Sequence, residues 1–153
     1  MTTPSVAKQL AGFIDKFDPA VAKLIRSCRG ALRRRFPTAI ELVYDNYNFF
    51  VIAFASSERT SDCFISLASY ARGVRLFFVN GAKLPDPHKI LEGGGKQVRS
   101  IRVENAAVLA TPAVEALFQA ALAQAKVPLP SKGPGCTIIK SISAKQRPRR
   151  ASA

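Results

Sequence analysis

Apolar residues recur along this chain at two spacings, and each spacing predicts a different kind of element. Over residues 18–36 they fall every three to four positions, which predicts a long amphipathic helix with basic side chains facing outward. Asp18-Pro19 is a strong helix-start signal, and the helix should end before Pro37, because the residue before a proline is pushed out of the helical region. Thr111-Pro112 predicts the start of a second long helix, and residues 6–17 predict a shorter one.

Short apolar runs and alternating patterns predict a group of strands after the first long helix. The expected strands cover residues 40–45, 49–55, 63–70, 74–79, 99–104 and 136–142. Turn-prone residues separate the first strand from the second and the third from the fourth, so two hairpins are predicted. Strands that follow one another in this way, flanked by helices rather than alternating with them, indicate an α+β fold.

The length of 153 residues favours a single domain over residues 1–143, followed by a basic, solvated tail over residues 144–153. The apolar runs are far shorter than the ~20 residues that a membrane-spanning helix needs, and no secretory signal pattern is visible. Cys28, Cys63 and Cys136 lie far apart, which favours buried thiols over a disulfide framework or a zinc site. We therefore expect a cytoplasmic protein with no membrane partner, no metal and no cofactor.

Charge is the unusual property of the composition. The chain carries 23 Lys and Arg against 10 Asp and Glu, a formal net charge of +13, and seven of these cations lie beyond residue 125. A positive surface attracts nucleic acid, anionic membranes and anionic metabolites, so charge alone does not choose among these partners.

The most distinctive segment is a glycine-rich loop that leads into a strand with several cations. Gly93-Gly94-Gly95-Lys96 departs from the nucleotide-binding phosphate loop, because Ile90 and Gln97 replace that motif's glycine and Ser/Thr and because a strand follows. Glycines can still turn successive backbone N–H groups toward an anion, with cationic side chains beside them. We expect an anionic ligand here, contacted by Gly94, Gly95, Lys96, Arg99 and Arg102. The alternative is a plain surface turn, with Arg99 paired to a carboxylate.

The segment Tyr44-Asp45-Asn46-Tyr47-Asn48 joins the first two predicted strands. Its phenols can line a polar pocket or stack on a flat ligand. Asn and Asp also stabilise turns by bonding to their own backbone, which leaves a purely structural alternative open. The single histidine, His88, has no partner near in sequence and the carboxylates are scattered, so no enzyme activity is predicted.

Two basic segments point to nucleic acid as an alternative partner. Arg33-Arg34-Arg35 and Arg147-Pro148-Arg149-Arg150 are denser in charge than solubility requires, although the sequence shows no helix-turn-helix, zinc-finger or aromatic RNA-binding signature. Non-specific contact with phosphates would use the outer face of the long helix and the tail. The candidate residues are Lys23, Arg26, Arg33, Arg34, Lys145, Arg147, Arg149 and Arg150.

Three segments together resemble the YdhG-like family, a family of domains of unknown function. They are the Tyr44–Asn48 cluster, Leu76-Phe77-Phe78 with Gly81 and Leu84-Pro85-Asp86-Pro87, and Gly95-Lys96-Gln97-Val98-Arg99-Ser100-Ile101-Arg102. The similarity runs from about Pro19 to Ser143, and the last segment is its most specific part. It implies an intracellular α+β domain without an established enzyme activity, in which helices pack on one face of a curved, mainly antiparallel sheet of about five to six strands.

The leading hypothesis is a small binding module, not an enzyme, that accepts an anionic ligand near residues 95–102. Because the positions that match the family are divided between residues 44–48 and this segment, we expect Tyr44 and Tyr47 to line the same cleft. Frataxin-like iron handling, which the resemblance also suggests, is a minor alternative, because iron needs clustered hard oxygen ligands and a basic surface repels ferrous ion. A homodimer is plausible for a small sheet protein, although no residue pattern demonstrates it.

Overall fold

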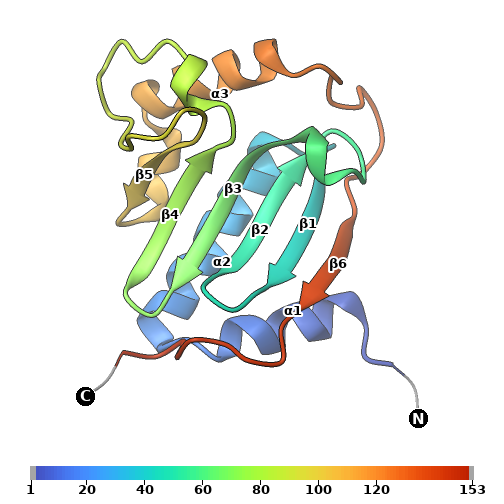
Figure 1. Cartoon of the computed structure of the whole chain (residues 1–153). Coiled ribbons are helices and arrows are strands. Elements are labelled where there is room, and N and C mark those ends of the chain that lie inside the picture. Colours follow the sequence, from blue (N-terminus) through green and yellow to red (C-terminus); the bar gives the residue numbers. More distant parts are fainter. Residues whose placement is uncertain (1–2, 152–153) are drawn as a thin grey trace.

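The computed structural model describes residues 3–151 and contains three α-helices and one six-stranded sheet (Figure 1). The helices are α1 (Val6–Asp15), α2 (Pro19–Arg35) and α3 (Pro112–Gln124). The strands are β1 (Ile40–Asp45), β2 (Phe50–Ala55), β3 (Cys63–Tyr70), β4 (Gly73–Phe78), β5 (Arg99–Val103) and β6 (Thr137–Ile142). Short 3₁₀ helices lie in the connections: η1 (Thr60–Asp62), η2 (Gly81–Lys83) and η3 (Ala106–Ala110). The predicted α+β fold is confirmed, and each strand starts and ends within one residue of its predicted bounds.

The strands form one curved sheet in the order β5-β4-β3-β2-β1-β6. Neighbours are antiparallel from β5 to β1. β1–β2 and β3–β4 are hairpins, residues 56–62 join β2 to β3, and the longer connection over residues 79–98 joins β4 to β5. β6 follows α3 and returns to the far edge, where it pairs parallel to β1. The mainly antiparallel sheet agrees with the prediction, and its parallel edge is a feature that hydrophobic patterning does not encode.

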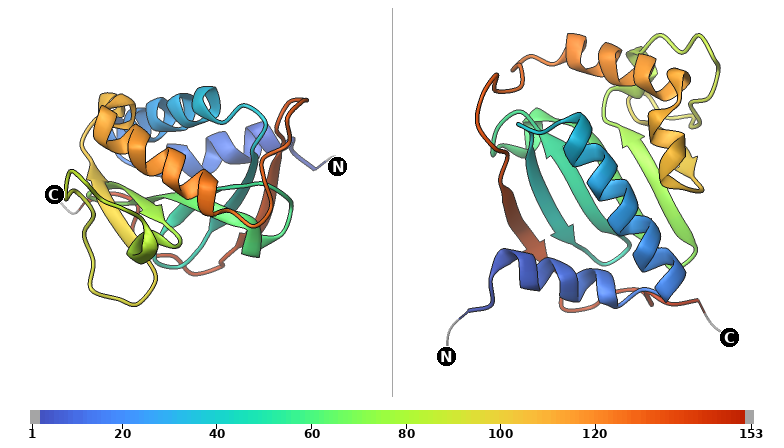
Figure 2. Two further views of the ribbon diagram at one scale, coloured as in Figure 1. Left: turned by 90° about the horizontal axis from the view of Figure 1, so that it is seen from above. Right: turned by 180° about the vertical axis from the view of Figure 1, so that it is seen from behind.

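All three helices cover the same face of the sheet (Figure 2). The core joins the apolar stripe of α2 to the inner side chains of the central strands, such as Ile25 and Leu67. Phe36, just after α2, packs edge-to-face on Phe64 of β3 and on Phe118 of α3, with ring centroids 5.1 Å apart in both pairs. Burying each such side chain contributes about 1.5–3 kcal/mol, so this packing fixes the helices to one face. No helix within residues 3–151 is long and apolar enough to cross a membrane.

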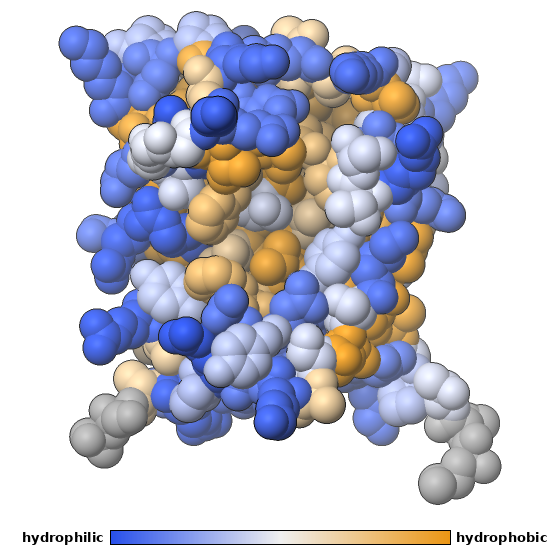
Figure 3. All heavy atoms as spheres, in the orientation of Figure 1, coloured by the Kyte–Doolittle hydropathy of each residue, from blue (hydrophilic) through white to orange (hydrophobic). Residues whose placement is uncertain are grey.

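The other face of the sheet carries no helix in the part of the chain that the structure describes (Figure 2). Leu42, Ala53 and Ala55 on this face are still buried, because larger neighbours such as Tyr44 and Val51 pack around them. Figure 3 looks onto this face and shows an apolar hollow along its centre, with hydrophilic side chains on both sides. The fold therefore leaves one broad, concave surface open.

Residues 144–151 are mostly exposed, but the segment is bound to the rest of the protein. They cross the lower end of the sheet in Figure 1, where Arg149 is 5% exposed and its Nη2 donates to Asp45 Oδ1 at 3.0 Å. Lys16 Nζ donates to Asp45 Oδ2 at 2.8 Å. Asp45 is fully buried and needs cationic partners, so this carboxylate holds the segment in place. Asp18 also binds the C-terminal segment. Its side chain makes no capping bond to α2 and accepts a hydrogen bond from the Ala151 N–H instead.

The three cysteines are free thiols, in agreement with the sequence analysis, but they are not all buried. Cys28 is buried, Cys63 is half-buried and Cys136 is exposed beside β6. Cys136 lies outside the core because β6 is an edge strand whose preceding loop faces solvent. Desolvation raises the pKa of the Cys28 thiol to about 11, so this thiol stays protonated inside the core.

Candidate functional site

Arg99 closes the glycine-rich loop. Its Nη1 donates to the carbonyl oxygens of Gly95 and Val98 at 2.6 and 2.9 Å, so the guanidinium is bound to backbone rather than to a carboxylate. Gly93 adopts a φ of 134°, a conformation that favours glycine. Gly81 lies so close to β5 that a Cβ there would come within 2.5 Å of Arg99 Cβ. Arg99 and the glycines around it therefore hold the loop against the sheet.

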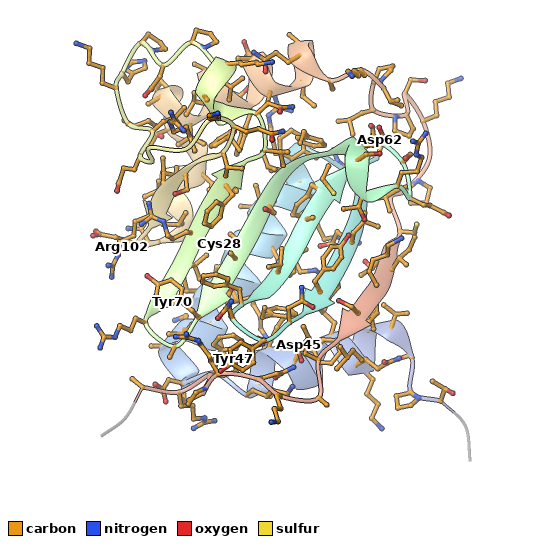
Figure 4. All side chains as sticks on the ribbon, viewed as in Figure 1. Cys28, Asp45, Tyr47, Asp62, Tyr70 and Arg102 are labelled. Atoms are coloured by element: carbon orange, nitrogen blue, oxygen red, sulfur yellow. The ribbon has the colours of Figure 1, made fainter. Side chains whose placement is uncertain are left out.

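The structure does not bring the predicted anion-binding residues into one cleft. Arg99 and Arg102 lie on opposite faces of β5, as their alternation predicts, and Arg102 is exposed on the uncovered face. Tyr44 lies on β1, four strands from β5, or about 19 Å at the usual strand spacing. Tyr47 lies in the β1–β2 turn at the other end of the sheet (Figure 4). Gly94, Gly95 and Lys96 are exposed in the loop.

A cavity of about 930 Å³ lies beside this loop, at the upper end of the sheet. Its walls come from the segment around η1, from the end of β4 with η2, and from the C-terminal end of α3. Phe64, Phe78 and Leu84 supply apolar surface. Gln97 belongs to the distinctive segment 95–102 and also lines the cavity. The region picked out by the sequence thus borders a concave site, although different side chains line it.

Three cations and one acid line the cavity. Arg59, Lys83 and Lys126 are exposed, and none of them forms an ion pair within residues 3–151. Asp62 is already engaged, because Ser57 Oγ donates to its Oδ2 at 2.5 Å. The positive charge of the cavity is therefore available to a ligand.

Side-chain amides complete the polar part of the cavity. Gln97 Nε2 donates to Asn80 Oδ1 at 2.9 Å, and Gln124 Nε2 donates to the Lys83 carbonyl oxygen at 2.8 Å. These bonds orient the amides, and the Asn80 Nδ2 has no hydrogen-bond acceptor among residues 3–151. Cys63 also lines the cavity, but burial and the nearby Asp62 raise the pKa of its thiol to about 11. A thiolate nucleophile is therefore not expected there at neutral pH.

The residues assigned to nucleic-acid contact are divided between several surfaces. Lys23, Arg26 and Arg150 line one shallow groove on the outer side of α2, where Arg26 pairs with Asp15 at 2.6 Å. Lys145 and Arg147 lie in the C-terminal segment, while Arg33 and Arg34 project from the last turn of α2; all four are exposed. Arg149 is withdrawn from any such surface by its buried pair with Asp45, which corrects its assignment.

Within the described residues 3–151, no group of three His, Cys, Asp or Glu side chains could hold a metal ion. Iron handling therefore has no ligand cluster to support it there. His88 is exposed in the loop between η2 and β5.

Sequence patterns do not identify the side chains of the cavity, because Arg59, Lys83 and Lys126 come from three distant segments. Only the arrangement of η1, η2 and α3 brings them together. One indirect signal of the cavity is present in the sequence, the glycine- and proline-rich stretch from Gly81 to Lys96. This stretch connects two predicted strands, so it lies at an end of the sheet.

No family model matches the chain, and comparisons with curated proteins and with solved structures find no match either. The resemblance to the YdhG-like family therefore stays a prediction from sequence motifs. Because a fold by itself does not imply a function, the function has to be argued from the site.

Proposed function

We propose that this chain is a binding module for a small anionic molecule, which occupies the cavity between η1, η2 and the end of α3. The observation that supports this proposal is the combination of apolar walls with three cations that have no carboxylate partner within the described residues. Ligand sites are commonly concave and largely apolar, with a few polar groups that set orientation. The cavity has this composition.

The lining also indicates the chemical class of the ligand. Lys83, Lys126 and Arg59 favour a phosphate, sulfonate or carboxylate group. Phe64 and Phe78 favour an apolar or planar part in the same molecule. The Asn80 amide adds a neutral donor. An amphiphilic organic anion fits these groups better than inorganic phosphate alone.

Binding of anilinonaphthalene sulfonate, an aromatic sulfonate with this combination of groups, tests the proposal. We expect saturable fluorescence enhancement with the folded protein, and competition by anionic metabolites. Lys83→Ala and Lys126→Ala should each weaken binding about tenfold, which corresponds to ~1.4 kcal/mol. Both side chains are exposed, so the variants should fold normally, as thermal unfolding can verify.

Two further lysine variants make the result specific. Lys8→Ala removes the same charge from exposed α1 and should leave the dissociation constant within about twofold. Lys96→Ala removes a cation from the glycine-rich loop outside the cavity lining. If Lys96→Ala weakened binding while Lys83→Ala did not, the ligand would lie at the loop and the cavity proposal would be wrong. An absence of saturable binding would also refute it.

A further inference from the structure

Aromatic and cationic side chains gather on the uncovered face of the sheet, and among the aromatic ones only Tyr44 and Tyr47 share a segment that the sequence analysis singles out. The aromatic residues are Tyr44, Tyr47, Phe49, Tyr70 and Phe77. They come from β1, from the β1–β2 turn, from β3 and from β4, and only the antiparallel pairing places them on one surface. This surface lies apart from the proposed anion cavity, whose Asp62 is at the opposite end of the sheet from Tyr47 (Figure 4).

The register of the strands shapes this face into a trough. Two rows in register run across five strands: Tyr44-Val51-Ala68-Arg75-Arg102 and Leu42-Ala53-Ser66-Phe77-Ser100. On the central strands β2 and β3 the first row has Val51 and Ala68 and the second has Ala53 and Ser66, so the floor is lower there than at the aromatic side chains. Tyr44 and Phe77 stand on either side, in different rows, on the strands β1 and β4, which lie about 14 Å apart at the usual strand spacing. The apolar hollow in Figure 3 is this trough.

The lower end of the trough carries aromatic rings that solvent can reach. Tyr47 is 49% exposed and Phe49 is 38% exposed. The Phe49 ring meets the Tyr70 ring edge-on at 6.0 Å, which holds both rings in place. The Arg147 guanidinium lies over the Tyr47 ring at 5.8 Å from its centroid. Exposed aromatic surface of this kind, fixed by neighbours and flanked by a cation, can accept another flat ring.

Cations border the same face and are mostly free. Arg72 lies at the β3–β4 turn and Arg102 on the edge strand β5, and both are exposed. Neither of these two, nor Arg147, has a carboxylate within ion-pair distance among residues 3–151. Arg75 is partly engaged, since it donates to Ser100 Oγ at 3.0 Å and approaches Glu92 at 3.4 Å. The border of the trough is therefore positive.

We infer that this face binds single-stranded nucleic acid, with unpaired bases stacked on the aromatic rings and phosphates held by the border arginines. Proteins that bind single strands combine a positive groove with stacking platforms, and aromatic side chains on an open sheet can serve as such platforms. In a duplex the bases stay paired and cannot stack on the aromatic rings, so a duplex could contact only the border arginines through its phosphates. An uncharged protein segment would satisfy the apolar trough but leave the arginines without partners. Charge complementarity thus favours a polyanion with exposed rings.

Fluorescence anisotropy with a labelled pyrimidine-rich RNA oligonucleotide, compared with a duplex of the same length, tests this inference on the full chain. We expect the single strand to bind more tightly than the duplex. Tyr47→Phe keeps the ring and should leave single-strand affinity unchanged, while Tyr47→Leu keeps apolar bulk and should weaken it about 5- to 150-fold. Because Tyr47 is exposed in a turn, both variants should fold, and Phe49→Leu gives a second measurement.

A salt series separates this face from the other basic surfaces. Removal of one phosphate contact by Arg102→Ala should reduce the slope of log affinity against log salt by about 0.7. Arg34→Ala removes the same charge from the outer face of α2 and should change little. Lys83→Ala, in the anion cavity, should also have no effect, so the two proposals can fail separately.

Several outcomes would overturn the inference. The first is an absence of RNA binding at low salt, and the second is an equal loss of affinity in Tyr47→Leu and Tyr47→Phe. The third is equal affinity for duplex and single strand, together with loss of binding in Arg34→Ala. The last result would instead place nucleic acid on α2. A stable dimer in light scattering that Phe49→Leu dissociates, together with no RNA binding, would mean that a second copy of the chain covers the face.

Discussion

Gly81 and Gly94 show how differently two glycines of one region are constrained. A Cβ on Gly81 would meet Arg99 Cβ at 2.5 Å and the Arg99 backbone nitrogen at 2.8 Å. Gly94 has nothing within 4 Å of the same position and no left-handed φ. At Gly81 the absence of a side chain lets η2 pack on β5, whereas at Gly94 the chain has ample space. The sequence alone cannot tell these two roles apart.

Gly81→Ala should therefore destabilise the fold by about 1–3 kcal/mol, because backbone atoms of β5 cannot yield as a flexible side chain would. Gly94→Ala is the matched control and should be neutral or stabilising by up to about 1 kcal/mol, since it restricts the unfolded chain without a clash. Chemical denaturation with urea measures both. Equal stability of the two variants would contradict the close approach of η2 and β5.

At the scale of elements, α2 forms ion pairs with its neighbours through four of its arginines, and two of these, Arg29 and Arg35, bind a carboxylate with two hydrogen bonds each. Arg29 makes two bonds of 2.8 Å to the buried carboxylate of Glu41 on β1, and Thr137 of β6 donates to the same carboxylate at 2.7 Å. Arg35 makes bonds of 2.7 and 2.8 Å to Glu115 of α3. Part of the positive charge of this helix is therefore used in structural ion pairs. The charge that remains unpaired on its exposed face is lower than the sequence indicates.

The Arg35–Glu115 pair predicts a pH dependence of stability. The hydrogen bonds from Arg35 lower the pKa of the Glu115 carboxyl below its ordinary value of 4.5. A carboxyl whose pKa is lower in the folded state stabilises the fold above its unfolded pKa, and this contribution is lost as pH falls through the folded pKa. Glu115→Gln should therefore cost up to about 1 kcal/mol at neutral pH, because the pair is partly exposed, and less at pH 3, which lies below the ordinary pKa of the carboxyl.

Urea denaturation of the original protein and of Glu115→Gln, each at neutral pH and at pH 3, measures this difference in the free energy of unfolding. Gln119→Ala, which removes a weaker donor to the same carboxylate, is a useful comparison and should have a smaller effect. If the effect of Glu115→Gln on the free energy of unfolding were independent of pH, the charge of the Glu115 carboxylate would not contribute to stability.

At the scale of the whole molecule, the residue after α1 and the segment 144–151 are held together at Asp45. Lys16 follows α1, Arg149 lies near the C-terminus, and both bind this buried carboxylate. Gln146 Nε2 also donates to the Asp45 carbonyl oxygen at 3.0 Å, and the Arg147 N–H donates to the Tyr47 carbonyl oxygen at 2.8 Å. Residues 144–151 thus complete the fold at the lower end of the sheet.

Removal of residues 145–153 should destabilise the protein by about 3–5 kcal/mol, because Asp45 would keep only one cationic partner in a buried position. Arg150→Ala is the control, since that side chain is exposed and bonds only to backbone carbonyls at 3.2 and 3.4 Å. Thermal unfolding measures both. Unchanged stability of the truncated chain would show that the C-terminal segment does not hold the fold.

Hydrophobic patterning and proline signals were sufficient to predict the elements of this protein. The bounds of the strands, the starts of α2 and α3, and the opposite orientation of Arg99 and Arg102 follow from local sequence. Periodicity depends on neighbouring residues alone, so it reports which face of an element is buried. The excess of positive charge also follows from composition.

Tertiary structure decided which of those charges are free and which side chains meet. It pairs β6 parallel to β1, buries Arg149, separates Tyr44 from Arg99, and builds the cavity from η1, η2 and α3. It also collects aromatic rings from separate segments onto one open face. The physical reason is the same in each case: these features depend on contacts between residues far apart in the chain, and strand order and register set those contacts.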